Sequence, residues 1–197
     1  MKRALLTTIT ILTLCLTASG VLAEDTPAAR KQAAQQVAGE FLKELGGALK
    51  AEMTKGNPQD AIRVCQEIAP AIANRLSLEN GWQVTRVGTR VRNPLLGTPD
   101  AWEQQVFEQF QKRAADGEPY KEMSYAEVVS EPQGRYFRYL KAIGVAPLCL
   151  TCHGAKEQIP EPVRAALKTY YPHDQAVNYQ AGDLRGGVSI KQPLNDN

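Results

Sequence analysis

The sequence predicts an α+β protein, and three observations support this fold class. Apolar side chains recur at helical spacing through residues 26–76. Runs rich in Val, Thr and aromatic residues then alternate in the manner of strands. Gly, Pro and Asn clusters separate these runs. The predicted order is helix, helix, strand, helix, two strands, loop, helix, strand, with antiparallel pairing of neighbouring strands and helices on one face.

Two helices are expected before the first strand. Residues 26–55 carry an apolar side chain at every fourth position, namely Val37, Phe41, Leu45, Leu49 and Met53. A second helix is predicted from Pro58 to about Leu76, with Asn57 as its N-cap and a kink or stop near Pro70. Cys65 should point into the core, because it shares a face with Ile62, Ala69, Ile72 and Leu76.

The remaining elements are assigned from strand composition and from turn residues. We expect strands at 81–92, 121–130, 135–143 and 184–192, and helices after Thr98-Pro99-Asp100 and over residues 162–171. Gly186-Gly187 inside the last strand predicts a bulge or a close approach of two backbones.

The N-terminus has the pattern of a secretory signal peptide over residues 1–23. Lys2 and Arg3 precede an apolar segment, and Val21-Leu22-Ala23 is a cleavage site of small residues. A retained membrane anchor is the alternative. Leu14 before Cys15 argues against a lipoprotein, which needs a small residue there. We therefore expect export to the periplasm.

Composition excludes some classes of function. Removal of residues 1–23 from the 197-residue chain leaves 174 residues and takes away two of the 23 basic residues, so that 21 remain against 21 acidic ones. A neutral chain argues against a nucleic-acid partner or a polybasic membrane binder. No later stretch is apolar enough to span a membrane, so we expect no membrane span after removal of the signal.

Cys149-Leu150-Thr151-Cys152-His153 is the Cys-x-x-Cys-His motif of c-type haem attachment. The two thiols can add to the two vinyl groups of one porphyrin edge, and the adjacent imidazole can bind the iron. The motif therefore predicts one covalent haem on Cys149 and Cys152, with His153 as an axial ligand.

Three other interpretations of the motif stay open. A thioredoxin-like dithiol lies at the start of a helix, yet no clear helix follows Gly154. A zinc site needs two more ligands, for which only Cys65 and His173 are present. A simple disulfide would leave His153 without a role.

The second axial ligand has four candidates: Cys65, His173, Met53 and Met123. Both methionines fit better as core residues than as ligands, and His173 lies in a turn at a helix end. Cys65 is the unpaired thiol of the mature chain, and its alternative is an ordinary buried thiol. A thiolate ligand would favour ferric iron and a low reduction potential.

Taken together, several segments resemble the PAS-like c-type haem domains, which occur alone as exported proteins or as input domains of bacterial signalling proteins. The segments are 61–65, 90–94, 99–103, 149–154, 171–172 and 182–186. The resemblance implies a PAS-like antiparallel sheet with flanking helices and a haem with His153 and Cys65 as axial ligands. The expected division of the chain is a signal peptide at 1–23, an N-terminal helical arm at 24–56 and a PAS-like c-type haem domain at 57–197.

Candidate partners for the haem propionates are Arg90, Arg92, Arg138 and Arg185, although each could instead be a solvated surface arginine. We expect redox sensing, with electron transfer to a redox partner protein as the alternative. An enzyme or gas binder ranks lowest, because no distal acid or base is evident apart from His173.

Overall fold

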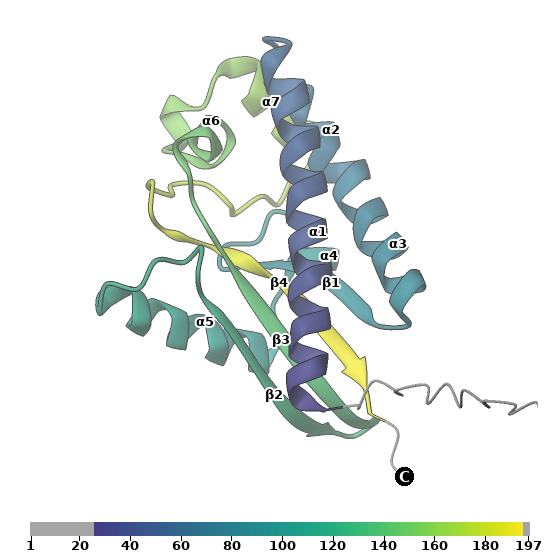
Figure 1. Cartoon of the computed structure of the whole chain (residues 1–197). Helices are drawn as coiled ribbons and strands as arrows, with labels where there is room; N and C mark the ends of the chain where they lie inside the picture. Colours follow the sequence, from purple (N-terminus) through teal and green to yellow (C-terminus); the bar gives the residue numbers. More distant parts are fainter. Residues whose placement is uncertain (1–25, 195–197) are drawn as a thin grey trace, which may run out of the picture.

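The structure is a computed structural model that describes residues 26–194. The predicted signal peptide and Cys15 lie outside the described residues. The predicted α+β class is confirmed, because helices surround one antiparallel sheet of four strands (Figure 1). In sheet order the strands are β1 (Gln83–Gly88), β4 (Leu184–Pro193), β3 (Gly134–Gly144) and β2 (Ser124–Glu131).

Seven α-helices lie within the described residues: α1 (Pro27–Thr54), α2 (Ala61–Arg63), α3 (Ala69–Asn80), α4 (Pro94–Gly97), α5 (Ala101–Ala115), α6 (Leu150–His153) and α7 (Glu161–Tyr170). A π-helical turn over Val64–Ile68 joins α2 to α3. Two 3-10 turns flank α6, at Pro147–Cys149 and Lys156–Gln158.

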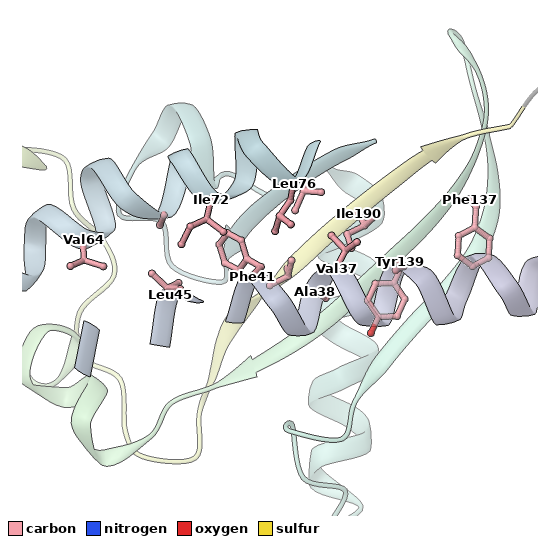
Figure 2. Packing of buried hydrophobic residues seen from close by; sticks show 14 residues of the cluster. Val37, Ala38, Phe41, Leu45, Val64, Ile72, Leu76, Phe137, Tyr139 and Ile190 are labelled. Atoms are coloured by element: carbon pink, nitrogen blue, oxygen red, sulfur yellow. The ribbon is translucent and has the colours of Figure 1, made fainter. Parts of the chain in front are cut away.

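Helices cover both faces of the sheet, whereas the sequence led us to expect them on one. Phe137 and Tyr139 of β3 pack with α1 and α3, while Leu140 and Ala142 of the same strand pack with α5. Successive strand residues point to opposite faces, and both faces of β3 are apolar, so each needs its own cover. Figure 2 shows the α1 side of this core, where side chains of α1, α3 and the strands gather in one cluster.

The long first helix forms as predicted. Thr26 caps it, its hydroxyl accepting a hydrogen bond from Ala29 N at 3.2 Å, and Pro27 occupies the first turn. Val37, Phe41 and Leu45 are buried in the core. The segment is thus an integral part of the packing, and the boundary between an arm and a domain at residue 57 stays a prediction.

The second helix differs from its prediction at three points. It begins at Ala61 rather than Pro58, and Asn57 does not cap it. It also continues past Pro70 to Asn80. A proline has no N–H and its ring crowds the carbonyl four residues earlier. The π-helical turn just before Pro70 widens the backbone, with Ala69 N bonded to Val64 O, so the helix proceeds without a stop.

The first strand is shorter than predicted and has a different neighbour. β1 pairs with β4, from Gln83↔Lys191 to Gly88↔Gly186, and β2 pairs with β3. β1 ends at Gly88, near the start of β4, and residues 89–93 leave the sheet. This exit brings four residues to the lining of a cavity, namely Arg90, Val91, Arg92 and Asn93.

Candidate haem site

A cavity of about 470 Å³ opens between the helices and the edge of the sheet. This is within the usual range for sites that hold a small molecule or cofactor. One wall is formed by α1 and α3, which present Leu45, Leu49 and Ala69 among other apolar groups. The opposite wall is β1 and the segment after it. The apolar stripe of α1 therefore serves two purposes, since its first part fills the core and its last part lines the cavity.

The four predicted site residues all line this one cavity. Cys149 ends the 3-10 turn, Cys152 and His153 lie on α6, and Cys65 lies on the π-helical turn. All three cysteines are free and partly buried. The structure brings together residues that are 84 positions apart in the sequence, from Cys65 to Cys149.

The two motif cysteines are presented by a short helical segment rather than by an extended loop. Residues three apart lie on the same side of a helix, so the 3-10 turn and α6 turn both Cys149 and Cys152 toward the cavity. Burial raises the pKa of the Cys152 thiol to about 11. A redox-active dithiol needs the opposite shift, so this environment does not favour the thioredoxin-like interpretation.

His153 has a fixed orientation. Its Nδ1–H donates to the Ala176 carbonyl at 2.7 Å, which leaves Nε2 as the free ring nitrogen. Burial, and secondarily the charges of Arg92 and Arg185, hold the pKa of His153 well below its usual range. The imidazole is thus neutral and has an unshared electron pair on Nε2 for a metal ion.

Cys65 owes its position to the π-helical turn. A π turn adds one residue to the helical repeat, so it rotates the side chains that follow relative to those on α2. Ile62 of α2 is 1 % exposed, and Ala69 and Ile72 of α3 are also buried. Cys65 lies between these groups, remains partly exposed and lines the cavity.

Arginines supply all the formal charge of the cavity wall. Arg86, Arg90, Arg92 and Arg185 line it, and no Asp or Glu among residues 26–194 does so. Within that part of the chain only Arg92 of the four forms an ion pair, with Asp174. Burial lowers the pKa of Arg185 to about 10, which still leaves it protonated at neutral pH. The cavity therefore combines an apolar interior with a surplus of positive charge.

Arg92 is the most deeply buried of these arginines. Its side chain is 4 % exposed and is held by Asp174 and by two backbone carbonyls. Its Nη1 has no hydrogen-bond partner within the described residues. A buried donor without a partner is costly, so this nitrogen marks a place where a ligand atom can accept a bond.

The other candidates from the sequence fall in different places. Arg138 lies away from the cavity, in a buried ion pair with Glu103 and in a second ion pair, at 2.6 Å, with the partly exposed Asp100. Its inclusion as a propionate partner is therefore wrong. His173 is exposed and does not line the cavity, and Met123 is fully buried against α5. Met53 does line the cavity.

Sequence reasoning missed two groups of this site. Arg86 lies two residues after Val84 on β1, so strand alternation places both on the same face. Tyr171 also lines the cavity, 7 % exposed, and burial raises its pKa to about 12. The strand alternation of Arg86 was available in the sequence, whereas Tyr171 was marked only as part of the resembling segment 171–172, without a role in the site.

Gly186 confirms the predicted close approach of two backbones. Its φ is +152°, and a Cβ there would lie 2.1 Å from Val87 O. The register of β3 and β4 shifts next to it, between Ile143 and Gly144. Gly186 itself lines the cavity, so the missing side chain lets β4 pass close beside β1 at this wall.

The described residues contain neither a cluster of metal-binding side chains nor a helix able to span a membrane. Over residues 26–194 no group of three or more His, Cys, Asp or Glu side chains is arranged to hold one metal ion. No helix in that range is both long and apolar enough to cross a membrane.

Comparison with known proteins gives two matches. The model of the Tll0287-like family matches residues 15–193. The crystal structure of the cyanobacterial heme-protein Tll0287 is similar at 29 % identity with a TM-score of 0.54, covering 66 % of this chain and 71 % of that one. A search of curated proteins finds no match.

Proposed function

The chain belongs to the Tll0287-like family, and from this premise we propose that it is an exported redox sensor with one covalently bound haem. Cys149 and Cys152 would form the two thioether bonds, and His153 and Cys65 would be the axial ligands. The observation that carries the proposal is that all four side chains line one cavity. The solved relative, which is called a heme-protein, supports the choice of cofactor.

The lining of the cavity suits a haem in polarity and in charge. A porphyrin is a flat apolar ring with two carboxylates on one edge, so its site needs apolar walls and cations at one end. Here the leucines of α1 provide apolar contacts, and Arg86, Arg92 and Arg185 provide cations without competing carboxylates on the cavity wall. The partnerless Nη1 of Arg92 is suited to a propionate oxygen.

The chemistry of the donor set is also appropriate. Neutral His153, with Nδ1 engaged by Ala176, offers Nε2 to iron. Cys65 would bind as a thiolate, and the nearby arginine charges would stabilise that anion. When bound, the haem supplies a one-electron couple between ferric and ferrous iron.

Sensing is favoured by the position of Cys65 on the π-helical turn. That turn contacts both α1 and α3, the two helices that cover one face of the sheet. A change in the bond to Cys65 would therefore act on a helix segment with irregular hydrogen bonds and on its two neighbours. The PAS-like fold, the signal peptide at 1–23 and the periplasmic location belong to the same proposal.

Electron transfer is the second candidate, and exposed residues at the cavity favour it. Leu96 and Leu148 line the cavity and are 55 % and 54 % exposed, and Leu95 beside them is 93 % exposed. Such a patch could receive a redox partner protein close to the haem edge.

Purification from cells that mature c-type cytochromes tests the cofactor. Addition of an S–H across each vinyl group loses no atoms, so the denatured protein should be heavier than the processed polypeptide by one haem. Cys149→Ser/Cys152→Ser should release the haem on denaturation. A colourless product of polypeptide mass would refute the proposal.

Spectra of Cys65→Ser test the second ligand. The wild type should be low-spin in the ferric state, and the variant should become high-spin or recruit another ligand such as Met53. Met123→Leu is a matched control, because Met123 lies outside the cavity. A variant spectrum equal to that of the wild type would exclude Cys65. Rapid CO binding to the reduced protein would favour sensing, and inertness would favour electron transfer.

A further inference from the structure

We propose that Arg92, held in place by Asp174, is a positioning residue for the His153 imidazole and that its charge raises the reduction potential of the haem. This inference rests on the proposed function, because it concerns the same site. It assigns to Arg92 an action on the imidazole side of the iron that is separate from any contact with a propionate.

The Ala176 peptide connects the three side chains. Its carbonyl accepts from His153 Nδ1 at 2.7 Å and from Arg92 Nη2 at 3.3 Å. Its N–H donates to Asp174 Oδ1 at 2.7 Å, and Asp174 Oδ2 accepts from Arg92 Nε at 3.0 Å. The backbone of Ala176 is thus held at its N–H and at its carbonyl by the two members of one ion pair.

Arg92 also reaches the haem-binding motif directly. Its Nη2 donates to the Cys152 carbonyl at 2.6 Å. The cationic member of the pair therefore contacts both the carbonyl of the residue before His153 and the carbonyl to which the imidazole donates. Asp174 accepts hydrogen bonds from Arg92 and from Ala176 N and forms none with residues 149–153. Their side chains are 4 % and 9 % exposed, so water screens their charges little.

Two effects of Arg92 act in the same direction. A strong Nδ1–H···O=C bond makes the imidazole a better electron donor to a bound metal and so favours ferric iron. A second donor on the same carbonyl weakens that bond. A buried positive charge near the iron also favours the ferrous state, which has one positive charge less. Both effects raise the reduction potential.

Arg90 allows the specific contact to be separated from general charge. It lines the same cavity, but its Nη1 donates to the Val177 and Asn178 carbonyls at 2.8 and 2.6 Å. It shares no acceptor with His153. Arg164 is a control outside the cavity, because it bonds the Ile159 carbonyl at 2.6 Å and pairs with Glu161.

The test is redox titration of holoprotein variants whose covalent haem has been verified by mass. At the midpoint potential of the wild type, Arg92→Gln should raise the ferric-to-ferrous ratio roughly tenfold. This is the lower end of the changes in metal affinity or activity that follow when a group holding a metal ligand is substituted. For one electron this is a fall of about 59 mV. Asp174→Asn removes the compensating negative charge and should shift the ratio in the opposite direction. Arg92→Lys should stay closer to wild type than Arg92→Gln, because it keeps the charge.

The directions in which the variants shift the reduction potential distinguish an electrostatic role of Arg92 from a structural one. If Arg92 only supported the fold, Arg92→Gln and Asp174→Asn would shift the potential in the same direction, and that result would overturn the inference. An equal shift in Arg90→Gln or Arg164→Gln would overturn it too. If Arg92→Gln does not fold, Asp174→Asn still decides the sign, and a fall in reduction potential in that variant would overturn the inference. Absence of covalent haem in the wild type would refute the proposed function instead.

Discussion

Substitution of Gly186 by alanine should destabilise the fold at the wall of the cavity. The added Cβ would lie 2.1 Å from Val87 O and 2.8 Å from Gly88 Cα. Both atoms belong to the backbone of β1, which is hydrogen-bonded to β4 at this point. Neither can move away without separating the two strands, so no side-chain rearrangement can relieve the contact.

The magnitude follows from two contributions. The φ of +152° is a conformation that L-residues rarely adopt, and holding a residue in such a region costs about 1–3 kcal/mol. Overpacking of a closely packed site adds about 1–3 kcal/mol. Gly186→Ala should therefore lower the free energy of unfolding by about 2–6 kcal/mol. For a domain of this size that is a fall in Tm of roughly 5–20 °C.

Two other glycines serve as controls in thermal and urea unfolding followed by circular dichroism. Gly182 has φ of +94° with open space around it, so Gly182→Ala should show the conformational cost of about 1–3 kcal/mol alone. Gly47 lies exposed in α1 with nothing within 4 Å, so Gly47→Ala should stabilise by about 1 kcal/mol. If Gly186→Ala is no less stable than Gly182→Ala, the argument from close packing is wrong.

Two further predictions concern the buried ion-pair cluster at α5. Burial raises the pKa of Glu103 above its usual value of 4.5 despite Arg138 beside it. As the pH rises, the folded state therefore keeps this proton longer than the unfolded state does. The contribution of Glu103 to stability is present at low pH and falls as the pH rises through the raised pKa. The destabilisation caused by Glu103→Gln, measured by urea unfolding, should thus be larger near pH 4 than at pH 7, and the reverse order would show that the ion pair outweighs desolvation. Asp100 caps α5 by accepting a hydrogen bond from Glu103 N at 2.8 Å, so Asp100→Ala should lower the free energy of unfolding by about 1 kcal/mol. Asp100→Ser should restore part of this loss. Equal Tm values for the two variants would argue against a capping role.

Elements with their own local signals were predictable from the sequence. The four-residue apolar period predicted a helix over residues 26–55, within one residue of the observed ends of α1. The Asp100 and Glu103 pair marks the start of α5, where both halves of a capping box form. These interactions join residues at most four apart, so the sequence contains all the information they need.

Elements whose form depends on distant partners were predicted less well. Pro70 locally signals a stop, but packing of Ala69, Ile72 and Leu76 against the core keeps the helix going through a π turn. β1 pairs with β4, which lies about 100 residues later in the chain. Which faces of the sheet are buried likewise depends on which strands pair. The sequence alone therefore led us to expect helices on one face, whereas they cover both.

Two arginines show the same dependence on distant partners. Arg92 and Arg138 are both buried and both pair with acids, yet one lines the cavity and the other packs against α5. By itself the sequence determined the helix and strand periods, the caps and the Cys-x-x-Cys-His spacing. Only the tertiary structure decided which charges, thiols and aromatic groups share the cavity, because a side chain's surroundings depend on strand pairing and helix packing over the whole chain.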